Sequence, residues 1–284
     1  MWEIDKVIHD ITEGTIFEKL QKQTQEAVAK IPHDELRQAV TALLCRPQPN
    51  PILHARVLSN LVYADQYYQV FTTLELPHQL SVYEPCVGGS DPVIIAAEAY
   101  SDGQANYLSM NLNRLLREEL QAKISHLKSN ITIIGENAQK VFSHFMPNSV
   151  DISCFHHAIN DALQTALSEP RGMDTANIEW WSNERQMLEW MAEDFASGLI
   201  EKRGKKELME IIKCAVELTR TGGYLVFDHW VSMYYREQNW FPWKPFYDLV
   251  PITRQWIKES DLPVTEFQLL NADPQWWMFL RVEK

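Results

Sequence analysis

The stretch that decides the fold is VYEPCVGGSDP, residues 82–92. It places an acidic residue, Glu84, at the end of a short apolar run, followed by a glycine-containing loop and then by Asp91 and Pro92. Asp is a favourable N-cap residue and Pro suits the first helical turn, so a helix is expected to begin here. A strand end, a loop without bulky side chains and a helix N-terminus together form the usual ligand-binding edge of an open α/β sheet.

Downstream of this stretch, short apolar runs alternate with helical segments, as expected for βαβ units that build a largely parallel sheet. The clearest helix is expected over 205–220, with Leu208, Ile211 and Ala215 on one face and glycines after its end. The expected parallel strands cover residues 81–83, 106–110, 131–134, 150–155 and 224–227.

The last two apolar runs, 264–269 and 276–282, are joined by a short turn that contains Asn271, Asp273 and Pro274. So short a link cannot carry a crossover, and the two runs are expected to form an antiparallel hairpin. The sequence therefore predicts an α/β fold with a mostly parallel seven-stranded sheet over residues 81–284. Residues 1–80 carry apolar residues at helical spacing and predict a separate helical segment.

Composition and charge restrict the class of protein. The chain has 284 residues, 45% of them hydrophobic, and a formal net charge of -12. This acidic balance argues against nucleic acid as a partner, because such binding uses clustered lysines and arginines. No apolar stretch suggests a targeting or membrane-spanning segment, so we expect a cytoplasmic protein with no membrane partner. The four cysteines show no CxxC spacing and indicate neither a disulfide framework nor a zinc site.

The glycine loop resembles the first motif of class I S-adenosylmethionine-dependent methyltransferases, in which an acidic residue precedes three glycines at alternate positions. Gly88 takes the place of the middle glycine, whereas Cys86 and Ser90 stand at the outer two. Five parallel units closed by a hairpin are also similar to the core of this family. The resemblance implies S-adenosyl-L-methionine as the cofactor, S-adenosyl-L-homocysteine as its product, and cofactor contacts from Glu84, Cys86, Gly88 and Ser90. Glycine after the first strand is also common in α/β proteins of other kinds.

Later segments at strand ends extend the resemblance. Asn111 stands where the family has an acidic residue that binds both ribose hydroxyls, and Leu112 follows it. An amide keeps hydrogen bonds but lacks the charge that strengthens them, so modest cofactor affinity is expected. Residues 135–139, GENAQ, resemble the adenine-binding segment of the family, and residues 149–161 resemble its fourth motif. The further expected cofactor contacts are Glu136, Asn137, Ala138 and Phe155.

His156 and His157 leave the fourth strand where the resemblance places the methyl-transfer site. Methyl transfer needs alignment in a dry pocket, and a base where the nucleophile carries a proton of high pKa; histidine suits that role near neutral pH. We therefore expect catalytic roles for this pair, with structural hydrogen bonding as the alternative for each. Asp228 is similar to one acid of metal-dependent catechol-type enzymes, but the fourth-strand carboxylate of that group is not evident. No metal is therefore expected.

Two expected insertions, 165–204 and 230–262, hold an unusual share of the aromatic residues. Both lie where the resemblance places substrate pockets, and aromatic walls suit a flat ring, an apolar chain or a cationic amine. The alternative for most of them is packing of the N-terminal helices onto the core. The expected substrate contacts are Trp181, His229, Trp230, Tyr234 and Trp243.

The leading hypothesis is an S-adenosylmethionine-dependent methyltransferase that acts on an oxygen, nitrogen or carbon atom of a small molecule. The alternative is a protein of this fold that binds the cofactor in a regulatory or partner-binding role, which the departures at Cys86, Ser90 and Asn111 favour. Aminopropyl or aminocarboxypropyl transfer on the same fold is a third hypothesis, without a motif in its favour. The N-terminal helices are expected to form either a lid or a homodimer contact.

Overall fold

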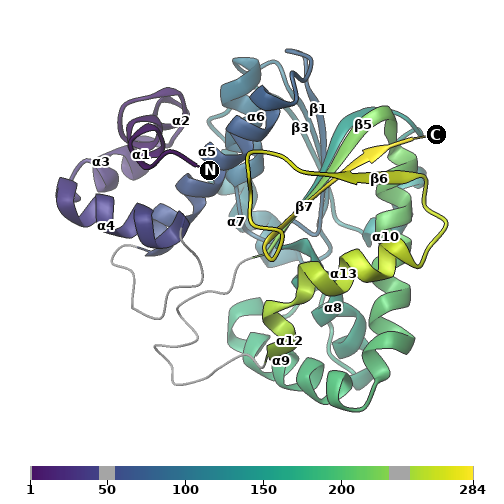
Figure 1. Cartoon of the computed structure of the whole chain (residues 1–284). Coiled ribbons are helices and arrows are strands. Elements are labelled where there is room, and N and C mark those ends of the chain that lie inside the picture. Colours follow the sequence, from purple (N-terminus) through teal and green to yellow (C-terminus); the bar gives the residue numbers. More distant parts are fainter. Residues whose placement is uncertain (1, 45–54, 230–243, 284) are drawn as a thin grey trace.

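The computed structural model describes residues 2–44, 55–229 and 244–283. Its centre is a seven-stranded sheet with the order β3-β2-β1-β4-β5-β7-β6 (Figure 1). Strands β1 to β5 pair in parallel, whereas β7 is antiparallel to both β5 and β6. The α/β fold, the seven strands and the C-terminal hairpin are therefore confirmed. The strands are β1 (Ser81–Pro85), β2 (Asn106–Met110), β3 (Asn130–Ile134), β4 (Val150–His156), β5 (Thr219–Asp228), β6 (Val264–Phe267) and β7 (Trp277–Val282).

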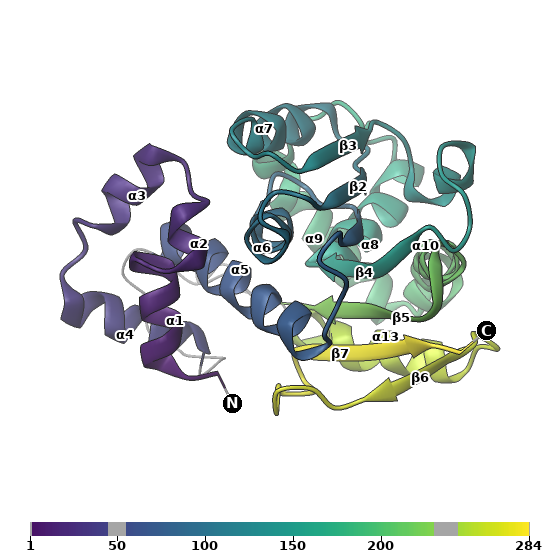
Figure 2. The same cartoon turned by 90° about the horizontal axis from the view of Figure 1, so that it is seen from above.

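Helices cover both faces of this sheet (Figure 2). The crossovers from β1 to β2 and from β2 to β3 run in one direction along the sheet, whereas β4 and β5 extend it in the other. Right-handed connections therefore place α6 and α7 on one face and α8 and α10 on the other. The direction reverses between β1 and β4, and this switch point is where open α/β sheets bind ligands. The helices of this part are α6 (Pro92–Ser101), α7 (Arg114–Ile124), α8 (Ala158–Ser168), α9 (Trp180–Ala196), α10 (Lys205–Leu218), α12 (Lys244–Tyr247) and α13 (Leu249–Lys258).

Several strand boundaries differ from the sequence prediction by one or two residues, and the start of β5 differs most. Helix α10 ends at Leu218, and β5 begins at Thr219 rather than at residue 224. Thr219 has an extended backbone and pairs with Val150 across an irregular register. Its hydroxyl lies 2.8 Å from that of Ser153, so tertiary pairing extends the strand into a segment whose glycines indicated a turn.

The N-terminal segment is helical, as predicted, and α5 joins it to the sheet (Figure 2). One set of buried α5 side chains, including Tyr67 and Phe71, belongs to the sheet core. Another set, including Leu58 and Val62, packs with the other N-terminal helices and with α6. The domain division at residue 80 stays a prediction, since α5 contributes to both hydrophobic clusters. The N-terminal helices are α1 (Ile4–Thr12), α2 (Thr15–Glu18), α3 (Lys22–Val28), α4 (His33–Leu44) and α5 (Ala55–Thr73).

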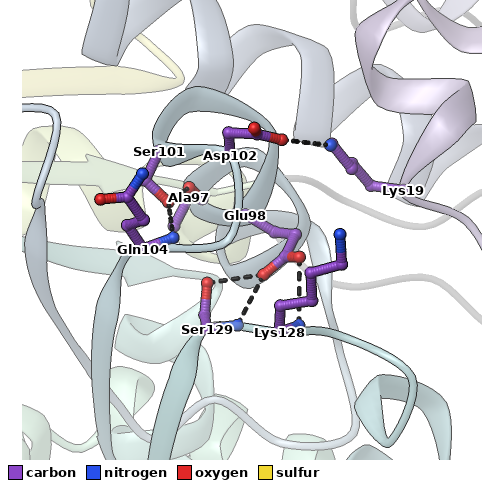
Figure 3. A network of polar contacts seen from close by, with 8 residues as sticks. All are labelled: Lys19, Ala97, Glu98, Ser101, Asp102, Gln104, Lys128 and Ser129. Atoms are coloured by element: carbon purple, nitrogen blue, oxygen red, sulfur yellow. Dashed lines mark hydrogen bonds and ion pairs between the residues drawn. The ribbon is translucent and has the colours of Figure 1, made fainter.

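A buried carboxylate fixes α6 to the turn before β3 (Figure 3). Glu98 accepts hydrogen bonds from the backbone N–H of Lys128 at 3.1 Å and of Ser129 at 2.9 Å. The Ser129 hydroxyl donates a third, at 2.6 Å. One turn later, Asp102 forms an exposed ion pair with Lys19 of the α2–α3 connection. The same helix end thus carries one buried and one exposed acidic contact.

Glu98→Gln is expected to lower the free energy of unfolding by about 1–3 kcal/mol, because the new amide group faces backbone donors and leaves one of them buried without an acceptor. Urea unfolding followed by circular dichroism measures this loss. Asp102→Asn is the matched control, since the Asp102 side chain is 76% exposed and its loss is expected to cost at most about 0.5 kcal/mol. Equal losses of unfolding free energy in the two variants would contradict the stabilising role of the Glu98 hydrogen bonds.

Candidate active site

The loop between β1 and α6 makes a tight turn, in which the Ser90 N–H donates to the Val87 carbonyl at 3.3 Å. Cys86 and Gly88 both lie in the left-handed region, at φ 54° and 60°. Cys86 thus adopts a conformation that favours glycine, the residue that the resemblance places there. Pro92 opens α6 as expected, but the Asp91 side chain makes no cap hydrogen bond. Asp91 occupies the predicted N-cap position, but its side chain accepts a hydrogen bond from Asn60 of α5 at 3.3 Å instead of from the helix backbone.

Glu84 lies at the end of β1 and is fully buried. The Tyr107 hydroxyl donates a hydrogen bond to its carboxylate, and burial raises the pKa of Glu84 well above its ordinary range. Glu84 is not among the residues that line the cavities at this sheet edge. Its contact with the cofactor therefore stays a prediction.

A cavity of about 320 Å³, here the smaller cavity, opens at the carboxyl ends of β1, β2 and β3. Five of the expected cofactor residues meet on its wall, although they come from three different connections. The Asn137 side chain also accepts a hydrogen bond from the Gln139 N–H at 2.9 Å, which shapes the turn after β3. The five residues are Cys86, Leu112, Glu136, Asn137 and Ala138.

A cavity of about 510 Å³, here the larger cavity, lies on the other side of the glycine loop. Its wall includes Gly88, Ser90 and both predicted catalytic histidines, together with aromatic side chains from three elements. Between the two cavities is a hollow of about 30 Å³, lined by Cys86, Gly88 and Asn111 among others. The glycine loop thus borders all of this space. The aromatic residues on the larger wall are Tyr63, Trp181 and Phe246.

Asn111 and Phe155 are placed differently from the other expected cofactor residues. The Asn111 amide donates a hydrogen bond to the Gly88 carbonyl at 2.6 Å, so in this structure it binds the loop. Phe155 is fully buried and stacks on Phe227 with ring centroids 4.3 Å apart. It belongs to the sheet core rather than to either cavity wall, and its cofactor contact also stays a prediction.

The predicted catalytic pair lies beside a buried carboxylate. His156, at the end of β4, is in register with Asp228 at the end of β5. Nδ1 of His156 lies 3.0 Å and 3.1 Å from the two Asp228 carboxylate oxygens. His157 follows in the left-handed region at φ 55°, with its Nε2 atom 4.0 Å from Asp228 Oδ2. Tyr67 of α5 donates a hydrogen bond to Asp228 Oδ1 at 2.5 Å.

The larger cavity is acidic at the glycine loop. Asp161 of α8 is half-buried there, and its Oδ1 atom accepts a hydrogen bond from the Asn160 amide at 3.2 Å. Burial, and then repulsion by Glu184 of α9, raises the pKa of Asp161 well above its ordinary range. Asp161, Glu184 and the α5 tyrosines are functional candidates that appear only in the structure, because on helices their spacing is the same as that of packing residues.

Among the expected substrate contacts, Trp181 is 58% exposed and lines the larger cavity. His229 is buried, and its Nε2 atom lies 2.9 Å from the Phe246 carbonyl oxygen, so it supports the wall rather than lining it. Trp230, Tyr234 and Trp243 lie outside the described residues. Within the described ranges, no helix is both long and apolar enough to cross a membrane.

Comparison with known proteins addresses the fold. No protein-family model matches the chain, and no curated protein matches it in sequence. It is similar in structure to a provisionally assigned S-adenosyl-L-methionine-dependent methyltransferase from Methanococcus maripaludis, with 11% identity, 81% of this chain and 89% of that chain covered, and a TM-score of 0.51. The chain has a class I methyltransferase fold.

Two further similarities have lower TM-scores. One is to a SAM-dependent methyltransferase from Aquifex aeolicus, with 12% identity, 75% of this chain and 87% of that chain covered, and a TM-score of 0.44. The other is to a provisionally assigned rRNA methylase from Clostridium thermocellum, with 10% identity, 78% and 95% covered, and a TM-score of 0.47. The sheet order and the similarity to the Methanococcus structure are the features that show the class I methyltransferase fold.

Proposed function

We propose that the chain transfers a methyl group from S-adenosyl-L-methionine to a small-molecule acceptor. The observation that supports this most is the arrangement of the two cavities around the glycine loop. The smaller cavity gathers Cys86, Leu112 and the 136–138 segment, and the larger one gathers His156 and His157. A cofactor whose adenosine lies in the first and whose sulfonium lies at Gly88 presents its methyl group to the second.

The size and charge of the larger cavity support a small acceptor. Its volume of about 510 Å³ is in the range of pockets for drug-sized ligands. The chain carries a net charge of -12, and the cavity wall carries the carboxyl groups of Glu119 and Glu184 against the ammonium group of Lys123, which favours a neutral or cationic acceptor over a polyanion. An assay with ribosomal RNA as acceptor is the direct test of the competing substrate class.

In this proposal the residues act mainly by placement. The aromatic walls exclude water and hold the acceptor in line with the methyl group, which supplies most of the acceleration. His157, whose side chain is 24% exposed toward the cavity, is the histidine that reaches the acceptor. His156 is almost fully buried and held by Asp228.

A label-transfer assay with pooled metabolites tests this proposal. His157→Asn is expected to lower kcat by about 100-fold or more, with S-adenosyl-L-methionine affinity changed by at most about threefold, or about 0.7 kcal/mol. Asn is chosen because it tolerates the left-handed backbone at this position. His9→Asn, at an exposed histidine of α1, is the control and should keep full turnover. Equal turnover in His157→Asn would remove this residue from the mechanism.

A second candidate function is cofactor binding without transfer. The hydrogen bond from Asn111 to Gly88 and the hollow of only about 30 Å³ between the cavities favour it. Calorimetry that detects S-adenosyl-L-methionine binding, combined with no label transfer to any acceptor pool, would select this function over catalysis.

A further inference from the structure

Three potential metal ligands converge at the ends of two neighbouring strands. His156 and His157 come from the end of β4, and Asp228 comes from the end of β5. One imidazole nitrogen from each histidine and one carboxylate oxygen all lie within 4.8 Å of one another. The parallel register of β4 and β5 pairs His156 with Asp228, so the sheet itself brings these donors together.

The separations suit a metal centre. Zinc binds histidine nitrogen and carboxylate oxygen at about 2.0–2.2 Å, which places tetrahedral donors about 3.4 Å apart. His156 Nδ1 lies 3.1 Å from Asp228 Oδ2, and His157 Nε2 lies 4.0 Å from the same oxygen. These two separations bracket the tetrahedral value, and all three donors lie within 4.8 Å of one another.

The buried charge of Asp228 also supports a bound cation. The Asp228 side chain is fully buried, with 0% of its surface accessible to solvent, and the His156 side chain is 1% accessible. A buried carboxylate needs a compensating cation. In the part of the chain that the structure describes, its ion-pair partners are the two histidines, which are cationic only when protonated, and no lysine or arginine.

The surroundings orient the donors. The Tyr67 hydroxyl donates to Asp228 Oδ1 at 2.5 Å, and Oδ2 lies 3.1 Å from His156 Nδ1. Outer hydrogen bonds of this kind orient metal-binding carboxylates. His157 is the N-cap residue of α8, and its left-handed backbone, at φ 55°, is uncommon outside glycine. In this conformation its Nε2 atom lies 4.0 Å from Asp228 Oδ2.

We propose that His156, His157 and Asp228 bind a divalent transition-metal ion of the zinc type beside the larger cavity. Two imidazoles and one carboxylate suit Zn²⁺ or Fe²⁺ better than Mg²⁺ or Ca²⁺, which prefer oxygen donors. Three protein ligands leave a position for a ligand from the cavity, which the two histidines line. Its use in orienting an oxygen or nitrogen acceptor rests on the proposed function; metal binding does not.

This inference departs from the sequence expectation of no metal. That expectation depended on a carboxylate in the fourth strand, the arrangement of the catechol-type enzymes. Here the fourth strand supplies both histidines and the fifth strand supplies the carboxylate. The donor set is therefore different and becomes visible only when β4 and β5 are paired.

The test measures metal in the whole chain without cofactor. Protein is stripped with a chelator and then dialysed against Zn²⁺. Elemental mass spectrometry is expected to find about one Zn²⁺ ion per chain, because the structure offers one such site among its described residues. Co²⁺ in place of Zn²⁺ is expected to give the visible absorption of a low-symmetry, four- or five-coordinate site. The Tm should rise with Zn²⁺ concentration, since the ion binds the folded state.

Variants distinguish the site from adventitious binding. Asp228→Asn and His157→Asn are each expected to weaken Zn²⁺ binding by about 100-fold or more, and Tyr67→Phe by about 10–100-fold. His9→Asn is the matched control and should keep the ion, because His9 lies 3.0 Å from the Glu13 carboxylate but belongs to no cluster of three potential ligands among the described residues. Wild-type protein without bound Zn²⁺, or an unchanged Co²⁺ spectrum in folded His157→Asn, would overturn the inference.

The two proposals fail separately. Label transfer by a protein that binds no metal would refute the metal site and leave the methyltransferase proposal intact. Metal bound at His156, His157 and Asp228, with no methyl transfer and no S-adenosyl-L-methionine binding, would refute the methyltransferase proposal and leave the metal site intact.

Discussion

Gly88→Val is expected to lower the affinity for S-adenosyl-L-methionine by about 100-fold or more, which corresponds to about 2.7 kcal/mol. Gly88 has φ +60°, a conformation that a β-branched residue rarely adopts. A Cβ atom there would also lie 3.3 Å from Asp161 Oδ2, so the positive φ together with this close contact favours a shift of the loop. Because this loop borders both cavities, a shift displaces the cofactor as well as the acceptor.

Isothermal calorimetry with S-adenosyl-L-methionine and S-adenosyl-L-homocysteine measures this loss. Gly198→Val is the matched control, since Gly198 also has positive φ, at +72°, but no atom lies within 4 Å of its Cβ position. It carries the same backbone strain away from the site and should bind normally, provided that both variants remain folded by circular dichroism. Unchanged binding in Gly88→Val would contradict the loop assignment.

Asp65→Asn is expected to stabilise the folded chain above neutral pH and to flatten its pH dependence. Asp65 of α5 is fully buried beside Asp10 of α1 and accepts a hydrogen bond from Gln69 at 2.6 Å. Burial, and then a hydrogen bond and repulsion involving Asp10, raise the pKa of Asp65 from 3.8 to about 8. Asparagine resembles the protonated acid and carries no charge to bury.

The direction of the pH effect follows from proton binding. Below pH 3.8 Asp65 is protonated in both states, and its contribution to stability is complete. As the pH rises from there to about 8, the unfolded chain releases this proton while the folded chain keeps it. The free energy of unfolding then falls by about 1.4 kcal/mol per pH unit from this group.

The measurement is urea unfolding of wild type and variant at about pH 5, 6, 7 and 8. These pH values lie between the pKa of Asp65 in the unfolded chain, 3.8, and that in the folded chain, about 8. Asp34→Asn in α4 serves as the control, because the Asp34 side chain is 97% exposed and its loss should change neither the slope nor the stability appreciably. Parallel pH profiles for wild type and Asp65→Asn would show that the Asp10–Asp65 contact does not hold a proton.

The fold was largely predictable because its signals are local. Alternation of apolar runs with helical segments gave the parallel units, and the short link after residue 269 required a hairpin. The start of β5 was not predictable, since Thr219 joins the sheet through pairing with Val150 rather than through its own sequence pattern. Part of the aromatic prediction, at Trp230, Tyr234 and Trp243, lies outside the described residues.

The candidate site was predictable only in part. Residues next to strand ends could be selected because parallel strands share one ligand-binding edge, and five of those selected line the smaller cavity. Phe155 was selected by position, but its side chain faces the core, because successive residues of a strand point to opposite faces. Asp161 is the last residue of the segment that resembles the fourth motif but was not selected, and Glu184 lies on a helix without a motif.

The sequence by itself determined the succession of elements and the edge of the sheet where chemistry is expected, because hydrophobic periodicity and turn residues act over a few positions. Only the tertiary structure decided what meets at that edge. Tyr67 and Asp228 are 161 residues apart in the chain, yet share a hydrogen bond because α5 packs on the sheet beside β5. The pairing of β4 with β5 likewise joins His156 and His157 to a carboxylate that no local pattern could assign to them.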